Sequence, residues 1–143
     1  MSTQLRRMAT LIAAGLFMLL ALAACGPKNI KVTAGTAEQT YTMLLDRNTA
    51  KAGDVTFDVT NQAASETHEF VIVQTDLAAD SLPLDADGNV PEDQITVVDE
   101  VEDIAPGESK SLTVNLPAGH YALICNLPDH YRQGMHADFT VNP

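Results

Sequence analysis

The sequence predicts an all-β protein, an antiparallel β-sandwich of seven to eight short strands. Apolar and polar residues alternate in three segments, residues 54–60, 111–116 and 136–142. A period of two with one apolar face is typical of a strand that lies over a hydrophobic core. Turn signals separate these segments, and the sequence lacks the pattern of an amphipathic helix.

Four further segments complete the expected strands. β-branched and aromatic residues, which favour strands, gather in residues 41–45, 70–73, 95–98 and 121–124. The turn signals between expected strands are Lys51-Ala-Gly53, Ala105-Pro-Gly107 and Pro117-Ala-Gly119.

Residues 76–93 are acidic and contain two prolines, so we expect a long connection there rather than two strands. Within it, residues 85–89 partly match a calcium-binding loop. The match fails because Val90 stands at the sixth position instead of Gly and Thr96 at the twelfth instead of Glu. We expect no calcium site.

The first 24 residues have the layout of a secretory signal. Arg6 and Arg7 precede an apolar stretch that ends in small residues directly before Cys25. This ending is similar to bacterial lipoprotein signals, in which the cysteine sulfur takes a diacylglyceryl group and becomes the new N-terminus. The alternatives are an ordinary signal and an uncleaved membrane helix.

On this interpretation the chain has three parts. Residues 1–24 are a lipoprotein signal peptide, residues 25–37 are the lipidated N-terminus with a polar tether, and residues 38–143 are the folded domain. More than one acyl chain anchors a protein stably. We therefore expect a membrane-anchored, extracytoplasmic protein, on the periplasmic side or at the cell surface.

The charge of the processed chain is strongly negative. After residue 24 there are 19 acidic and six basic residues, a net charge near −13. This excess argues against nucleic acid as a partner. It favours partners with basic patches, and an acidic surface that serves only solubility is an equal alternative.

The cysteine count points to a metal. The chain has two cysteines, and lipidation of Cys25 leaves Cys125 without a disulfide partner. A single thiol in an oxidising compartment is liable to oxidation unless something occupies it. A metal ion is the natural occupant.

Four side chains form a candidate metal site. Cys125, His130 and Met135 are spaced five residues apart, and His68 lies 57 positions before the cysteine. Two imidazoles, one thiolate and a weak thioether are the ligand set of electron-transfer copper sites. Pro128 and Gly134 let the chain between the expected strands turn back on itself.

Strand parity selects among the histidines. Met135 is in phase with the apolar residues of the last strand, and His68 is in phase with Phe70 and Ile72, so both should face the core. His136 is out of phase with Met135, and His120 has the opposite parity to Cys125. We expect neither of these two histidines at the site.

These residues resemble the cupredoxins, the small type 1 blue copper proteins. Two segments carry the resemblance: the loop Cys125-x4-His130-x4-Met135 with the strand after it, and the segment His68-Glu-Phe-Val-Ile72. The loop is most similar to that of the auracyanin and azurin-like branch. The resemblance implies a Greek-key sandwich with one copper ion that alternates between Cu(I) and Cu(II). His68, Cys125 and His130 would be trigonal ligands, and Met135 a long axial ligand.

The resemblance also implies how electrons pass. A partner would dock over His130 on an apolar patch of Leu127, Pro128 and Tyr131, near Met135, with Asp129 and Arg132 as a charged rim. Glu69 and Asn126, each directly after a ligand, would surround the site. Glu69 stands where many family members have Asn, which leaves the reduction potential open.

The implied function is that of a monomeric electron carrier, not an enzyme. Its transient partners would be cytochromes or membrane respiratory and photosynthetic complexes, with contact to the membrane through the lipid and no nucleic acid. The alternative is a copper-trafficking or copper-storage lipoprotein, which the lack of a methionine cluster disfavours. Zinc is disfavoured because a thioether is a poor zinc ligand.

Overall fold

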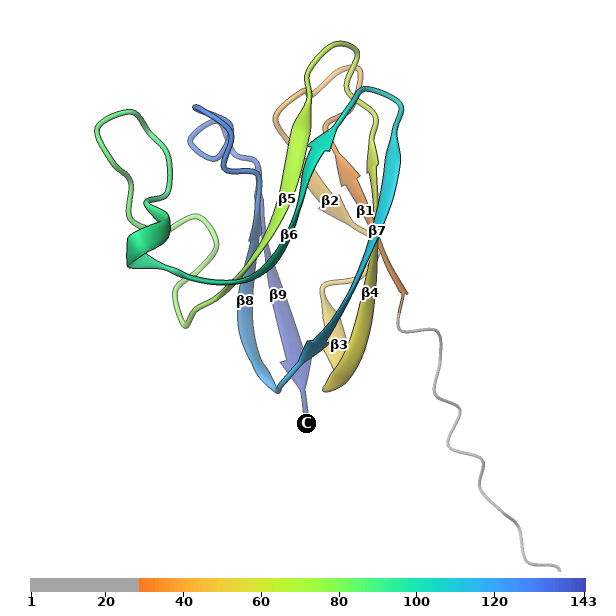
Figure 1. The fold of residues 1–143 in the computed structure, drawn as a ribbon, viewed down its shortest axis with the longest axis vertical. Helices are drawn as coiled ribbons and strands as arrows, with labels where there is room; N and C mark the ends of the chain where they lie inside the picture. Colours follow the sequence, from red (N-terminus) through yellow and green to blue (C-terminus); the bar gives the residue numbers. More distant parts are fainter. Residues whose placement is uncertain (1–28) are drawn as a thin grey trace, which may run out of the picture.

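The structure is a computed structural model that describes residues 29–143. It consists of two β-sheets packed face to face (Figure 1). The expected signal peptide and the lipidation of Cys25 lie outside the described residues. Within residues 29–143 no helix is long and apolar enough to cross a membrane, and the one helix in this range is η1 (Glu92–Gln94).

The first sheet has four strands in the order β2-β1-β4-β7. These strands are β1 (Asn29–Ala34), β2 (Met43–Leu45), β4 (Gly53–Asn61) and β7 (Ser109–Leu116). β1 pairs antiparallel with β2 but parallel with β4.

The second sheet has five strands in the order β3-β9-β8-β5-β6. These strands are β3 (Thr49–Lys51), β5 (His68–Gln74), β6 (Thr96–Ile104), β8 (Gly119–Ile124) and β9 (His136–Asn142). All pairings are antiparallel except that of β3 with β9.

The prediction of an all-β sandwich is confirmed. Each of the seven expected segments lies wholly or largely in a strand, and the three turn signals lie at junctions between consecutive strands. Two further strands, β1 and β3, bring the number in residues 29–143 to nine. Both additions make one parallel pairing, whereas the expected strands pair antiparallel with one another.

The interpretation of residues 25–37 as a tether is wrong for β1. Ile30, Val32 and Ala34 are at most 1% exposed and belong to the main core. They alternate with Asn29, Lys31 and Thr33, so the segment has the strand pattern, although it is short and polar on one face. The folded domain therefore includes residue 29 onward.

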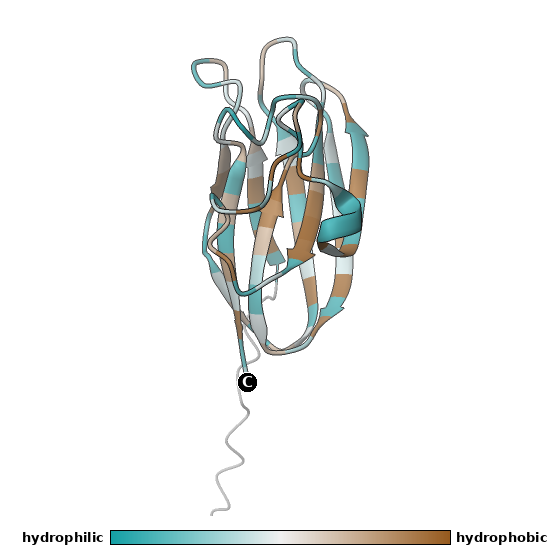
Figure 2. Cartoon of the chain, turned by 90° about the vertical axis from the view of Figure 1, so that its left-hand side faces the viewer, coloured by the Kyte–Doolittle hydropathy of each residue, from teal (hydrophilic) through white to brown (hydrophobic). Residues whose placement is uncertain are grey.

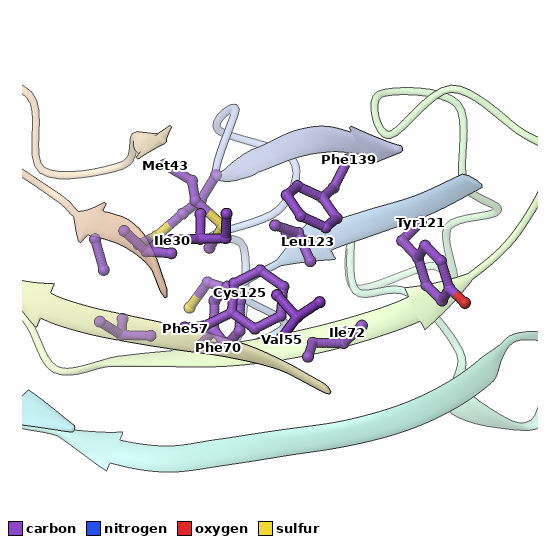
Figure 3. Close-up of a cluster of buried hydrophobic side chains, with 14 of the residues drawn as sticks. Ile30, Met43, Val55, Phe57, Phe70, Ile72, Tyr121, Leu123, Cys125 and Phe139 are labelled. Carbon is purple, nitrogen blue, oxygen red and sulfur yellow. The ribbon is translucent and has the colours of Figure 1, made fainter. Parts of the chain in front are cut away.

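The main core lies between the two sheets. Its aromatic centre is Phe57 of β4, whose ring centroid lies 5.2 Å from those of Phe70 and Phe139 in the opposite sheet (Figure 3). Figure 2 shows the alternation of hydrophilic and hydrophobic residues along the strands that supplies these inward side chains. Cys125 belongs to the same cluster, so the candidate site is built onto the core.

A second, smaller core lies on the other face of β5 and β8. The connection between β5 and β6, residues 75–95, packs against this face; we call it the outer connection (Figure 1). The members of this cluster are Val71, Val73, Ala79, Leu82, Val90, Ala122, Ile124 and Tyr131. Because β5 is covered on both faces, its residues 70–73 form a continuous apolar run instead of alternating.

Candidate metal centre

Three potential ligand atoms meet at one end of the sandwich. His68 is the first residue of β5, Cys125 directly follows β8, and His130 lies in the loop between β8 and β9. One side-chain atom from each lies within 4.8 Å of the other two. The Nδ1 atom of His130 is 3.3 Å from His68 Nδ1 and 3.3 Å from Cys125 Sγ.

The loop between β8 and β9 is a compact series of turns; we call residues 126–134 the ligand loop. The amide of His130 donates to the Leu127 carbonyl at 3.0 Å, and the Met135 amide donates to the His130 carbonyl at 3.2 Å. The Cys125 amide then donates to the Met135 carbonyl at 3.1 Å. Gly134 has a φ of 106°, which only glycine adopts without strain, and it closes the loop.

The donors are shielded from water. His68, Cys125 and Met135 are 0% exposed, and His130 is 8% exposed. Burial, with a smaller effect of His130, lowers the pKa of His68 to about 4, and burial lowers the pKa of His130. Both imidazoles are therefore neutral at neutral pH, the form that offers a nitrogen lone pair to a metal.

Unlike the two imidazoles, the thiol of Cys125 is not in its metal-binding form at neutral pH. Burial raises its pKa to about 11, so the copper-free protein holds a protonated thiol at neutral pH. The backbone amide of Glu69 donates to Sγ at 3.4 Å and favours the thiolate. Cys125 would hold a metal ion as the thiolate, the ligating form, so its proton would be released on binding.

The other nitrogen of His68 marks a tight contact. Nε2 is buried and has no hydrogen bond of good geometry, although the nearby Thr40 carbonyl raises the pKa of His68 slightly against the larger effect of burial. A Cβ atom on Gly35 would lie 2.7 Å from this nitrogen and 2.6 Å from the carbonyl oxygen of Thr40. Only glycine at this position leaves room for the imidazole and the carbonyl together, and Gly35 has a φ of 66°.

The two residues expected to surround the site are joined to each other. The Glu69 carboxylate accepts a hydrogen bond from the backbone amide of Asn126 at 2.7 Å. Burial raises the pKa of Glu69. The Asn126 side chain points elsewhere and bonds to the backbone of Val90.

The parity argument places the remaining histidines correctly. His120 contacts the Thr75 carbonyl at 2.9 Å and the Asp138 carboxylate at 3.0 Å. His136 packs beside Tyr131, with ring centroids 5.1 Å apart. Neither belongs to the group of converging donors within residues 29–143.

The expected docking patch needs one correction. Tyr131 is only 4% exposed, because its hydroxyl donates to the Ala79 carbonyl at 2.7 Å and accepts from the Leu82 amide at 3.0 Å. Pro128 is exposed and Leu127 is half-buried. Sequence reasoning also missed Tyr41, whose ring packs edge-on to His130 at 4.9 Å, since no pattern in the sequence links the two.

A β-sandwich with two buried imidazoles and a buried thiol at one end defines a cupredoxin-type copper protein. The family of copper-binding proteins that comprises plastocyanin and azurin matches residues 24–142. The chain belongs to this family, and the resident metal is one copper ion. The predicted resemblance is confirmed, and members of this family carry electrons.

Solved structures with this fold agree. Reduced auracyanin from Roseiflexus castenholzii is 24% identical, with a TM-score of 0.60, over 81% of this chain and 98% of that chain. Auracyanin A from Chloroflexus aurantiacus, a blue copper protein, is 26% identical, with a TM-score of 0.57, over 82% and 100%. Rusticyanin from Thiobacillus ferrooxidans is 17% identical, with a TM-score of 0.60, over 80% and 76%. No relative is found among curated protein sequences.

Proposed function

We propose that this protein is a membrane-anchored blue copper protein that carries single electrons between redox partners. His68, Cys125, His130 and Met135 would hold the metal. The observation that carries the proposal is the convergence of two neutral imidazoles and one thiol within 4.8 Å inside a dry core. When bound, copper supplies a one-electron Cu(I)/Cu(II) couple with this kind of ligand set.

The burial of the donors supports a proposal for the electron route. His130 is 8% exposed, whereas His68 and Cys125 are 0% exposed, so the edge of His130 is the accessible part of the donor group. A partner would dock over His130 and the neighbouring Leu127 and Pro128. The exposed ion pair of Asp129 with Arg132 forms a charged rim beside them. Such contacts would be transient, with charge setting the encounter rate.

The same burial favours an electron carrier over a copper-trafficking protein. Handing a metal to a partner requires donors that the partner can reach, and two of these three donors are closed to solvent. We propose an electron carrier and not an enzyme. The partners would be cytochromes or membrane respiratory or photosynthetic complexes, met by a monomer.

Anchoring by lipid at Cys25 is part of the proposal. Its support is the sequence before Cys25, together with a family match that starts at residue 24 and excludes the apolar segment. The protein would then work outside the cytoplasmic membrane. Its acidic surface would suit partners with basic docking faces.

The visible spectrum of the copper-loaded protein tests the proposal. We expect one Cu(II) per chain and an intense thiolate-to-copper band, lost in Cys125→Ser and kept in the control His120→Ala. Both variants should unfold cooperatively in urea, which shows that loss of colour is not loss of fold. A wild-type protein that binds Cu(II) without this band would overturn the proposal.

A further inference from the structure

The outer connection is bonded to the ligand loop at three places. The amide of Val90 donates to the Asn126 side chain at 2.8 Å, and that side chain donates back to the Val90 carbonyl at 2.9 Å. The amide of Asp129 donates to the side chain of Asn89 at 3.2 Å. The third place is the buried hydroxyl of Tyr131.

Tyr131 makes the most buried of these contacts. Its hydroxyl donates to the Ala79 carbonyl and accepts from the Leu82 amide, so it satisfies two backbone groups of an irregular segment that has no strand partner there. Buried backbone groups without partners are costly, so each bond ties the two segments together. The tyrosine ring fills the smaller core beside them.

The positions of these residues relative to the donors form a pattern. Cys125 and His130 point into the metal site, and the next residue in each case, Asn126 or Tyr131, reaches the opposite way into the outer connection. Each donor from this part of the chain is thus followed by a side chain that fixes the backbone from outside.

The turn before His130 also depends on outside support. Asp129 has a φ of 72°, a left-handed conformation that residues other than glycine adopt only at a cost in free energy. Its amide is bonded to Asn89, and its carboxylate is paired with Arg132. Such a conformation persists where the surrounding contacts over-determine it.

We propose that Tyr131 is a positioning residue for the metal site. Through the outer connection it holds the ligand loop so that His130 Nδ1 stays close to Cys125 Sγ and His68 Nδ1, with or without metal. The outer connection is then a second layer that keeps the donors in place. The expected effect on copper release rests on the function proposed above. The expected effect on the ligand loop of the copper-free protein does not.

The test compares Tyr131→Phe with the matched control Tyr121→Phe. Tyr121 is also buried, and its hydroxyl likewise donates to a backbone carbonyl, that of Pro117, at 2.7 Å. It lies in β8 four residues before Cys125, and its hydroxyl bonds to neither the ligand loop nor the outer connection. Both variants keep the ring and lose the hydroxyl. We expect both to lower the urea midpoint of unfolding.

Only Tyr131→Phe should disturb the ligand loop. In the copper-free protein we expect faster hydrogen exchange at the amides of His130 and Met135. In the copper-loaded protein we expect Cu(II) to leave to a chelator about fivefold faster. Tyr131→Phe removes two hydrogen bonds, and this factor corresponds to about one of them acting on the ligand loop. The copper hyperfine splitting in electron paramagnetic resonance should also change.

Two outcomes would overturn the inference. Equal exchange, copper release and spectra in the two variants would reduce Tyr131 to a contribution to stability. If Tyr131→Phe does not unfold cooperatively, Asn89→Ala tests the step on which the inference depends, that the outer connection holds the ligand loop. It removes the acceptor of the Asp129 amide outside the apolar cluster. Unchanged exchange at His130 would show that the outer connection does not hold the loop, and would refute the inference that Tyr131 acts through it. A wild-type protein without a blue site would refute only the proposed function, since the exchange experiment needs no copper.

Discussion

The carboxylate of Glu69 accepts a hydrogen bond from the backbone amide of Asn126 at 2.7 Å, which joins the residue after the first histidine to the residue after the cysteine. The backbone amide of Glu69 lies against Cys125 Sγ at 3.4 Å. One residue therefore contacts both the donor sulfur and the start of the ligand loop. Many members of the family have asparagine at the position of Glu69. The glutamate side chain is one methylene longer, which carries its carboxylate further from the backbone, toward the Asn126 amide.

Substitution of Glu69 should affect both stability and reduction potential. Glu69→Ala leaves the Asn126 amide without its partner and should lower the free energy of unfolding by about 2 kcal/mol. Glu69→Gln keeps an acceptor and should lower it less. The Gln variant should have a higher reduction potential, because it removes a negative charge that favours Cu(II). Cyclic voltammetry and urea unfolding measure the two effects, and an unchanged potential in Glu69→Gln would contradict the electrostatic part.

Gly35→Ala should displace the His68 ring. The added Cβ would lie 2.7 Å from Nε2 and also suffers the strain of a φ of 66°. Gly107→Ala is the matched control, because Gly107 has a φ of 80° and nothing within 4 Å of the added atom. We expect Gly35→Ala to cost about 2 kcal/mol more than the control in thermal unfolding. Copper affinity should fall only in Gly35→Ala, and equal affinities would show that the imidazole moves freely.

The copper-free protein should lose stability as the pH falls below 6.5. The pKa of His68 is lowered to about 4 by burial in the folded state, so the unfolded chain binds more protons between these values. The contribution of His68 is complete above pH 6.5 and is lost progressively as the pH falls to about 4. Urea unfolding across this range should show this loss, and His68→Asn should show a smaller one, which leaves the part due to His130. An NMR titration that finds His68 protonated near pH 6.5 would refute the burial argument.

Met135→Gln should keep the blue colour and lower the reduction potential. Met135 is 0% exposed and leads directly into β9, so its side chain stays at the core end of the site. An amide oxygen is a harder ligand than a thioether and favours Cu(II) over Cu(I). Loss of the visible band in this variant would contradict the assignment of Met135 as a weak axial ligand, and would show that copper binding requires its thioether.

Cys25→Ser should release the protein from membranes without changing the copper site. Lipidation needs the cysteine thiol, whereas the metal donors lie more than 40 residues further along the chain. Fractionation of cells that express the wild-type and variant chains measures this. A variant that stays in the membrane fraction would favour an uncleaved apolar helix over a lipid anchor.

The sequence predicted the sandwich and the meeting of Cys125 with His130 because both follow from local rules. His68 joined them because its parity faces the core and its imidazole completes the ligand set. Strand parity decides which face a side chain takes, and a hairpin brings residues five positions apart to one place. The same rules excluded His120 and His136. Parity predicts which face of a strand each side chain takes from that strand's own sequence alone.

The features that were missed depend on contacts between distant segments. The alternation in β1 is too short to distinguish a strand from a polar tether, and its burial comes from pairing with the distant strand β4. Tyr131 was placed on the surface because its partners, Ala79 and Leu82, come from the outer connection 49 or more positions earlier. The contact of Tyr41 with His130 was not predicted for the same reason, because the two residues come from distant segments.

The place of β9 in the second sheet ties the metal site to the completion of the fold. β9 lies between β8 and β3, and it begins directly after Met135. A chain that lacked this strand would leave β3 without its partner and β8 with an open edge, and it would have nothing to hold the end of the ligand loop. The donors would then be near in sequence but free to separate, so the ability to bind copper reports that the last strand of the sandwich is in place.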